Sequence, residues 1–428
     1  MATMTDDPEP ILRSLFDAAL AAVSAARCVP PHLPPAPKGR TVVVGAGKAA
    51  AAMAQAVEAH WPGSVGGAVV VPYGHGVPCA GIEVIEAAHP VPDDAGAGAA
   101  RRMLDLVSGL GRDDLVLALI SGGGSALLAL PAPAITLADK QAVTRALLRS
   151  GAPIAAINTV RKHLSAIKGG RLALAAHPAR VVTLVISDVP GDDPATVASG
   201  PTLADATTLA EARAVLARYA IDLPPAVARH LADAETPKPG DSAFAGDVTR
   251  IVARAADALD AAAAAAKARG LGVTLLGDAV EGEARTAAAE HARLALARAA
   301  ADPGGHVILS GGETTVTIAG GAGSGGRNSE YLLALGLALN GAARISALAC
   351  DSDGIDGAST AAGALLRPDS LARARALGLD ARAMLAAHES AALFAALGDA
   401  VVTGPTRTNV NDFRCLLIAA GDGQRLDL

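Results

Sequence analysis

Short runs of β-branched residues alternate with long alanine-rich stretches along this chain, and this alternation limits the folds that it can adopt. Buried strands are predicted at 41–45 (TVVVG), 66–72 (GGAVVVP) and 115–121 (LVLALIS), and segments of helical spacing separate them. Such alternation is typical of βαβ units, whose strands are parallel. The sequence therefore predicts an α/β fold with a Rossmann-like parallel sheet.

The length and one turn-rich segment predict two domains. The chain has 428 residues, more than a single hydrophobic core usually supports. Residues 220–247, rich in proline and glycine, are interpreted as the connection. We expect a large N-terminal domain over 1–240 and a smaller, mixed α/β domain over 247–428 that includes the strand VTRIVAR. In the smaller domain, ETTVTI (313–318) alternates like a half-exposed, antiparallel strand.

Composition argues against several classes of partner. The net charge is −6 and aromatic residues make up 2%, so neither a basic face nor a stacking platform for nucleic acid is expected. No uncharged apolar run approaches the roughly 18 residues of a membrane span, so no membrane partner is expected. The four cysteines form no CxxC pair and the N-terminus is acidic where a signal peptide is basic, which favours the cytoplasm. The sequence leaves open whether the chain forms a homodimer.

The segment GAGKAA forms a glycine-rich corner between the first strand and a helix. Gly45, Gly47 and Ala50 match the dinucleotide fingerprint, but the second strand ends in VVVPYGHG, without the carboxylate that would bind the ribose. A P-loop is excluded because its first glycine and its Ser/Thr are missing. We expect free N–H groups at the start of the helix, together with Lys48, to bind an anion. The alternative is a close strand-to-helix crossing with a solvated lysine.

A second glycine-rich corner, SGGGSALL, follows the strand LVLALIS. A nucleophile elbow would need glycines on both sides of its serine, so hydrolysis is weakly supported. Glycines at the end of a parallel strand allow backbone N–H groups to approach a ligand, whereas a purely structural turn is the alternative. The predicted binding residues of this corner are Ser121, Gly122, Gly123, Gly124 and Ser125.

Carboxylates follow two other predicted strands. Asp188 ends RVVTLVISD, and Asp351 and Asp353 lie in ACDSDGIDGAST. Carboxylates at strand ends can coordinate Mg²⁺, and Asp188 can also accept a hydroxyl proton. The alternative for all three is turn capping by aspartate.

Two further segments carry polar side chains suited to an anionic substrate. A glycine-rich loop from residue 319 delivers Arg327 and Asn328 to the first turn of an apolar helix, where a guanidinium can bind a carboxylate or phosphate bidentately. The segment TGPTRTNVND adds Thr406 and Asn409 after the last predicted strand. A disordered linker is the alternative for the first segment, and an ordinary solvated loop is the alternative for the second.

Seven motifs occur in order over nearly the whole chain: VVVGAGKAA, LISGGGSALL, NTVRKHLSAIKGGRLA, VISDVPGDDPATVASGPT, LSGGETTVTIAGGAGSGGRNSEYLL, DSDGIDGAS and TGPTRTNVNDF. Together they resemble the glycerate 2-kinase family. The resemblance implies phosphorylation of D-glycerate at O2 by ATP with Mg²⁺, yielding 2-phosphoglycerate, in a cleft between two α/β domains. It also implies that Lys48 is the family's key lysine and Arg327 the arginine of its GGRN motif.

The combined hypothesis is that Lys48 and Arg327, from different domains, hold the glycerate carboxylate and the transferring phosphate. Asp188, Asp351 and Asp353 would bind Mg²⁺, with Asp188 as the proton acceptor. Alanine at Lys48 or Arg327 is then expected to reduce turnover by orders of magnitude with thermal stability nearly unchanged. Some relatives in the family carry the label hydroxypyruvate reductase, so an NAD(P)-dependent reductase is the alternative, disfavoured by the missing ribose carboxylate. The third functional hypothesis is a protein that binds a sugar acid without catalysing a reaction.

Overall fold

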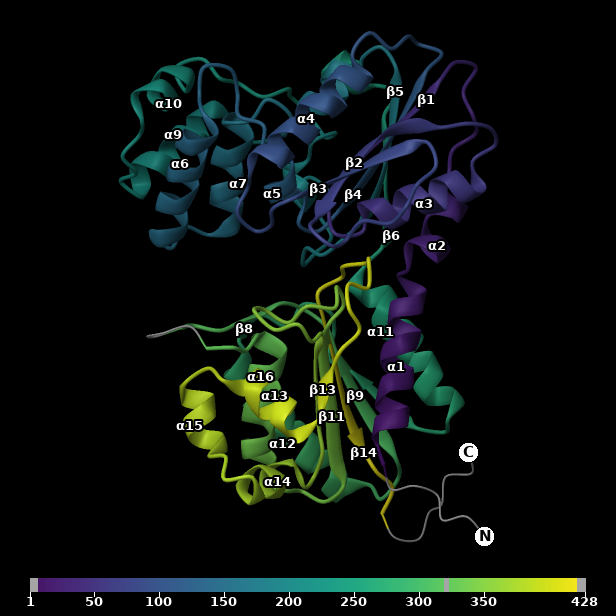
Figure 1. The fold of residues 1–428 in the computed structure, drawn as a ribbon, viewed down its shortest axis with the longest axis vertical. Helices are drawn as coiled ribbons and strands as arrows, with labels where there is room; N and C mark the ends of the chain where they lie inside the picture. Colours follow the sequence, from purple (N-terminus) through teal and green to yellow (C-terminus); the bar gives the residue numbers. More distant parts are fainter. Residues whose placement is uncertain (1–6, 319–322, 422–428) are drawn as a thin grey trace. The chain divides into compact units, whose positions relative to one another are not determined.

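The computed structural model describes residues 7–318 and 323–421, and contacts within the chain divide it into two compact units (Figure 1). The N-terminal unit is Ala25–Ala253, and the C-terminal unit combines the residues up to Ser24 with those from Arg254 onward. These units differ from the predicted ranges 1–240 and 247–428 at both ends. The first helix packs with the C-terminal part of the chain, and the strand after residue 247 packs with the N-terminal part.

The N-terminal unit is built on a six-stranded sheet whose strands are all parallel. Its order is β3-β2-β1-β4-β5-β6, the order of the classic Rossmann sheet, which confirms the predicted fold class. The strands are β1 (Thr41–Ala46), β2 (Gly66–Pro72), β3 (Ile82–Ala87), β4 (Leu115–Ser121), β5 (Arg180–Ile186) and β6 (Val248–Ala253). The assignment of VTRIVAR to the second domain is therefore wrong, because β6 pairs in parallel with β5.

Helices cover this sheet and build a second apolar cluster beside it. The longer ones are α3 (Ala50–His60), α4 (Asp94–Val107), α6 (Leu137–Arg149), α7 (Ile154–His163) and α9 (Leu209–Arg218), and the short ones are α2 (Ala25–Cys28), α5 (Gly124–Leu127), α8 (Arg171–Ala176) and α10 (Pro225–His230). Three 3₁₀ turns complete the unit, η1 (Pro30–His32), η2 (Val197–Ser199) and η3 (Ser242–Phe244). Residues 220–247 are more than a linker, because Val227 and Leu231 are buried with α6, α7 and α9.

The C-terminal unit has a mixed six-stranded sheet, as the sequence predicted for this half of the chain. Its order is β13-β12-β11-β14-β9-β7, and only the β7–β9 pair is parallel. The strands are β7 (Gly272–Leu275), β9 (His306–Ser310), β11 (Ile345–Asp351), β12 (Gly363–Leu366), β13 (Ala400–Val401) and β14 (Asp412–Ile418). The segment ETTVTI contributes only β10 (Thr314–Thr315), which pairs in parallel with β8 (Gly282–Glu283), so the expected antiparallel strand is wrong.

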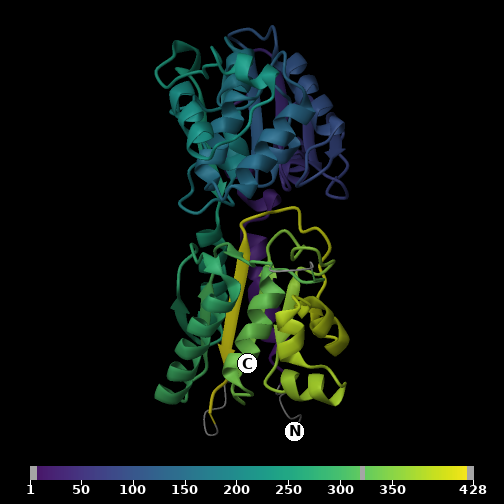
Figure 2. The same ribbon diagram turned by 90° about the vertical axis from the view of Figure 1, so that its left-hand side faces the viewer.

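Helix α1 (Glu9–Ala22) explains why the start of the chain belongs to the C-terminal unit. Figures 1 and 2 show it lying alongside α11 (Ala255–Ala268). Its apolar stripe is buried, and Phe16 contacts Phe413 with ring centroids 5.5 Å apart. The other helices of the unit are α12 (Ala284–Ala301), α13 (Arg327–Leu339), α14 (Ser370–Ala376), α15 (Ala381–Ala386) and α16 (Ser390–Leu397).

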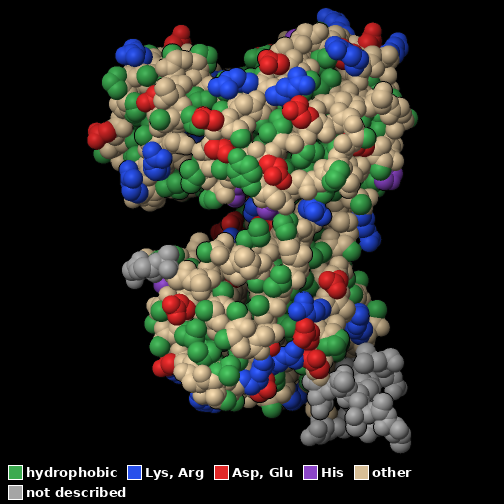
Figure 3. All heavy atoms as spheres, viewed as in Figure 1, with side chains coloured by type: hydrophobic (Ala, Val, Ile, Leu, Met, Phe, Trp, Pro, Cys, Tyr) green, Lys and Arg blue, Asp and Glu red, His purple; other side chains and the backbone are tan. Residues whose placement is uncertain are grey.

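Charged side chains of both signs are interspersed among the described residues on the face drawn in Figure 3. No helix in the described parts of the chain is both long enough and apolar enough to cross a membrane.

Candidate active site

Two glycines allow β1 and β4 to approach each other closely where the strand order of the parallel sheet reverses. A Cβ on Gly45 would lie 2.5 Å from the carbonyl oxygen of Leu119. A Cβ on Gly47, which has φ +129°, would lie 2.2 Å from Oγ of Ser121. Ligands of open α/β sheets bind beside such a reversal, at the carboxyl ends of the strands. The predicted residues of the two glycine-rich corners are therefore brought together at this edge.

The amides of the first corner are already engaged. Gly47 N donates to Val70 O at 3.1 Å, Lys48 N to Gly122 O at 2.8 Å, and Ala49 N to Ser121 Oγ at 3.0 Å. They are not available to an anion, contrary to the expectation from the sequence. Gly45 and Gly47 have a packing role here, and the Lys48 side chain is the group of this corner that can reach a ligand.

The second corner presents amides that the first does not. Within the described residues, the N–H groups of Gly122, Gly123 and Gly124 donate no hydrogen bond. Gly123 has φ +83°, the left-handed conformation that turns successive amides toward one point and forms an anion-binding nest. A Cβ on Gly123 would lie 3.4 Å from Cγ of Lys48 and 3.3 Å from the imidazole of His89. We call these three amides, with Lys48 and His89 beside them, the glycine nest.

The serine hydroxyls of this corner are engaged within the fold. Ser121 Oγ accepts the bond from Ala49 N. Ser125 Oγ lies 2.8 Å from Ser199 Oγ, and Ser199 Oγ donates to Asn158 Oδ1 at 3.3 Å, so Ser125 is the donor in the first pair. Lys168, almost completely buried, donates to Ser125 O at 2.8 Å.

The residue that follows the glycine nest, Ser125, is therefore held in place by contacts with Ser199 and Lys168, and Ser199 is held by Asn158. No role was predicted from the sequence for these three residues. The only signal for them was their position in the motifs NTVRKHLSAIKGGRLA and ASGPT.

Asp188 lies at the same edge of the sheet as the glycine nest. It follows β5 by two residues, and β5 pairs in parallel with β4. Its side chain is half-buried. The sheet therefore places one carboxylate on the side where the predicted anion-binding residues gather.

Arg327, the first residue of α13, is held by three carboxylates of the C-terminal unit. Its Nε donates to Asp412 Oδ1, Nη1 to Glu313 Oε1 and Nη2 to Asp351 Oδ2, each at 2.7 Å. Burial alone would lower the pKa of Arg327, but the three carboxylates outweigh it and raise the pKa above its ordinary value. The guanidinium of Arg327 therefore stays protonated and is held in place by three carboxylates, which carry more negative charge than it neutralises.

Buried polar groups hold this arrangement in place. Asp412 also accepts from Asn328 Nδ2 at 2.7 Å and from the fully buried Arg414. Asp356 accepts from the amides of Asn328 and Ser329, both at 2.9 Å, at the start of α13. Burial raises the pKa of Asp356 despite those two bonds.

Asn328 Oδ1 is buried and has no partner among the described residues. From the sequence, Asp412 was one of several polar residues of the candidate segment TGPTRTNVND, and no role was predicted for Glu313 or Asp356, although all three lie inside the motifs quoted above.

The predicted metal ligands do not form a cage. Asp351 Oδ1 accepts from Asp353 N at 3.1 Å, and Asp353 Oδ1 accepts from Ile355 N at 2.8 Å, so both aspartates cap turns. Asp188 belongs to the other unit. Across residues 7–318 and 323–421, no group of three or more His, Cys, Asp or Glu side chains is arranged to hold a metal ion.

Thr406 and Asn409 hold their own loop against the turn after β11. Thr406 N donates to Asp353 O at 3.0 Å, and its hydroxyl donates to Ser352 O. Asn409 is buried, and its Oδ1 accepts from Asn411 N at 3.4 Å. Of the loop predicted to precede Arg327, residues 319–322 lie outside the described part of the chain.

The fold and these groups define a two-unit α/β protein with an anion nest on a Rossmann-type sheet and an arginine–carboxylate cluster beside a mixed sheet. Two family matches correspond to its two parts. The family described as "Domain of unknown function (DUF4147)" matches residues 11–232, and the MOFRL family matches residues 306–412.

Relatives match the chain over nearly its full length. A protein of Agrobacterium vitis named "Putative hydroxypyruvate reductase" is 57% identical over 95% of this chain and 94% of its own. The D-glycerate 2-kinase of Thermotoga maritima is 37% identical over 95% of this chain and 98% of its own. The crystal structure of a Thermotoga maritima glycerate kinase superposes with a TM-score of 0.87 at 36% identity, covering 96% of this chain and 99% of that one. The chain belongs to the glycerate kinase family, which confirms the resemblance found in the sequence.

Proposed function

We propose that this protein transfers the γ-phosphoryl group of ATP to the 2-hydroxyl of D-glycerate, giving 2-phosphoglycerate and ADP. The glycine nest is the observation that carries the proposal. Three consecutive amides without partners among the described residues lie beside the Lys48 side chain, where the strand order reverses. Relatives named D-glycerate 2-kinase and glycerate kinase support the same substrates.

Phosphoryl transfer asks a protein mainly to align the reacting groups and to stabilise charge on the transferring oxygens. Fixed N–H dipoles and a cation do this without rearranging during the reaction. The Gly122–Gly124 amides and Lys48 meet that requirement, so we assign them to the γ-phosphoryl group. The 2-hydroxyl oxygen attacks phosphorus, the bond to the ADP oxygen breaks, and the hydroxyl proton passes to Asp188.

We assign to Arg327 the glycerate carboxylate. Its partner Glu313 has a side chain 47% exposed, whereas Asp351 and Asp412 are 7% and 0% exposed. An exposed ion pair is weak because water screens it. A substrate carboxylate can therefore displace Glu313 from Nη1 while the two buried carboxylates hold the guanidinium in place. The proposal requires the two units to deliver Lys48 and Arg327 to one substrate.

Mg²⁺ fits this protein as a companion of the nucleotide. Magnesium sites in kinases use one or two carboxylates together with substrate phosphates, so the lack of a three-ligand cage among the described residues is compatible with it. Asp188, Asp351 and Asp353 are the carboxylates that we propose to meet it. When bound, the ion would neutralise phosphate charge. We place the reaction in the cytoplasm, with ATP and D-glycerate as the small-molecule partners.

The alternative is an NAD(P)-dependent hydroxypyruvate reductase, favoured by the Rossmann strand order and by the name of the Agrobacterium vitis relative. A nicotinamide dinucleotide needs a carboxylate for its ribose near the end of β2. Glu86 of β3 is paired with Val71 near the end of that strand, and its Oε1 already accepts from the amides of Gly74 and Gly76, both at 3.1 Å. Because Glu86 already binds the amides of the turn after β2, it is not placed to bind a ribose, and the kinase is the better proposal.

Release of ADP tests the proposal. Purified protein with Mg-ATP is expected to release ADP only when D-glycerate is added, and to leave NADH absorbance unchanged with hydroxypyruvate. Lys48→Met should reduce kcat at least a hundredfold, whereas Lys38→Met, at an exposed lysine of the same unit, should leave it unchanged. Glycerate-independent ADP release, or oxidation of NADH, would contradict the kinase assignment.

A further inference from the structure

A cavity of about 140 Å³ lies in the N-terminal unit between α6 and residues 90–92. Its volume is roughly ten times what one ordered water needs. Lys140, Arg145 and Arg161 contribute positive charge to its lining, and none of the described residues that line it is acidic. Its apolar walls include Pro90, Leu137 and Leu148.

Two of these cations, one buried and one partly buried, have no carboxylate partner among the described residues. Lys140 is 6% exposed, and within the part of the chain that the structure describes its ammonium donates only to Leu130 O, at 3.3 Å. Arg161 is partly buried, and its guanidinium makes no hydrogen bond or ion pair with the described residues. Burial, Arg161 and Arg171 lower the pKa of Lys140 to about 7. Burial, Lys140 and Arg161 also lower the pKa of Lys168.

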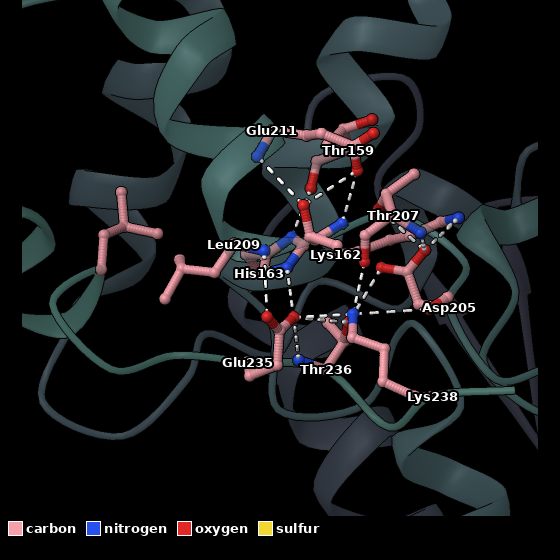
Figure 4. A network of polar contacts seen from close by, with 12 residues as sticks. Thr159, Lys162, His163, Asp205, Thr207, Leu209, Glu211, Glu235, Thr236 and Lys238 are labelled. Atoms are coloured by element: carbon pink, nitrogen blue, oxygen red, sulfur yellow. Dashed lines mark hydrogen bonds and ion pairs between the residues drawn. The ribbon is translucent and has the colours of Figure 1, made fainter. Parts of the chain in front are cut away.

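The next residue of α7 after Arg161 is Lys162, a buried cation that does have a carboxylate partner. Figure 4 shows Lys162 directed at Asp205, with Nζ–Oδ1 at 3.2 Å. In the same network, Glu235 pairs with Lys238 at 2.6 Å and with His163 at 3.2 Å. The unit thus neutralises the buried cation Lys162 with a carboxylate, whereas Lys140 and Arg161 at the cavity have no acidic partner among the residues described.

Unneutralised buried cations are costly, and an anion bound from solution removes that cost. The cavity also adjoins the glycine nest. Ser125, which follows Gly124, and Pro90, which follows His89, both line it. A ligand whose terminal phosphate occupies the nest can therefore extend into the cavity.

We propose that this cavity holds the adenosine end and inner phosphates of ATP. Lys140, Arg145 and Arg161 bind phosphate oxygens, and Leu137 and Leu148 pack against the base. Glycerate has no apolar body to use these walls. The inference rests on the proposed kinase function and assigns the nucleotide to the N-terminal unit.

Calorimetric titration of the whole protein with ADP, without glycerate, tests this assignment. Arg161→Met removes a cation, and Thr144→Phe fills the cavity from α6. Each is expected to raise the Kd of ADP at least tenfold. Arg149→Met, an exposed arginine of α6 outside the cavity lining, is the matched control and should leave the Kd unchanged. Melting temperatures within a few degrees of the wild type establish that the variants fold.

The outcomes separate this inference from the proposed function. Wild-type binding of ADP that both cavity variants retain would overturn the cavity assignment, even if the protein phosphorylates glycerate. Cavity-dependent binding of ADP by a protein that does not phosphorylate glycerate would support the cavity assignment and overturn the function. No binding of ADP or ATP by the wild type would overturn both.

Discussion

Replacing Arg327 by alanine should destabilise the C-terminal unit by about 3 kcal/mol. Removing one partner of a buried ion pair costs about 3–5 kcal/mol, because the other charge stays buried and unpaired. Here Asp351 and Asp412 both lose a charge partner but keep other contacts, the amide of Asp353 on Asp351 and Arg414 on Asp412, and the exposed Glu313 contributes at most about 1 kcal/mol. The lower end of the range therefore applies. The sequence alone predicted almost no effect on stability.

Differential scanning calorimetry measures this loss. For a unit of this size, about 3 kcal/mol corresponds to a fall in Tm of about 6–12 °C. The double variant Arg327→Ala/Asp351→Asn should regain more than half of it, because a neutral amide needs no cation. Arg382→Ala, at an exposed arginine of the same unit, is the control and should melt like the wild type. An Arg327→Ala protein melting within 1 °C of the wild type would refute the argument that this guanidinium compensates buried carboxylates.

Three further predictions concern the nest, a buried histidine and the cavity. Gly123→Ala should reduce kcat/KM at least tenfold, whereas Gly151→Ala, which shares the positive φ but has open space around it, should leave kcat/KM unchanged in the same ADP-release assay. Burial and Arg414 lower the pKa of His291 to about 4, so the unfolded state binds more protons between pH 4 and 6.5. Stability should therefore fall by about 3 kcal/mol as the pH is lowered through that window, and His291→Gln should abolish this dependence in denaturant titrations. Since Lys140 loses its charge above about pH 7, the Kd of ADP should rise between about pH 7 and pH 9, and Lys140→Met should remove the rise in calorimetric titrations.

The local features of the fold were predictable because each depends on residues close together in the sequence. The β-branched runs that became β1, β2 and β4 each carry their own signal of burial, and the capping box at Thr136 and Asp139 marks the start of α6. The glycine-rich corners were found in the same way. The two corners lie at the same edge of the sheet because β1 and β4 are parallel, and the alternation of strand and helix segments in the sequence already favours parallel strands.

Features set by long-range pairing were not predictable. ETTVTI alternates like a strand, yet its pairing is limited to β10 and β8. Helix α1 joins the C-terminal unit because its buried side chains pack against α11, a partner that no local pattern identifies.

The same limit applies to the candidate site. The guanidinium of Arg327 was predicted to meet a substrate anion, but its carboxylates arrive from Glu313, Asp351 and Asp412, on three other segments of the unit. The amides next to Lys48 looked free in the sequence because Gly122 O and Ser121 Oγ, which accept their bonds, belong to a strand end more than seventy residues away. Both differences concern which groups already have partners, and that depends on the packed structure.

Identification of the product by ³¹P NMR tests the central claim most directly. With D-glycerate and Mg-ATP, the protein should convert the ATP resonances to those of ADP and produce one new phosphomonoester resonance, that of 2-phosphoglycerate. Resonances of inorganic phosphate alone, or of a phosphoester at another position, would contradict the proposed transfer of a phosphoryl group to O2.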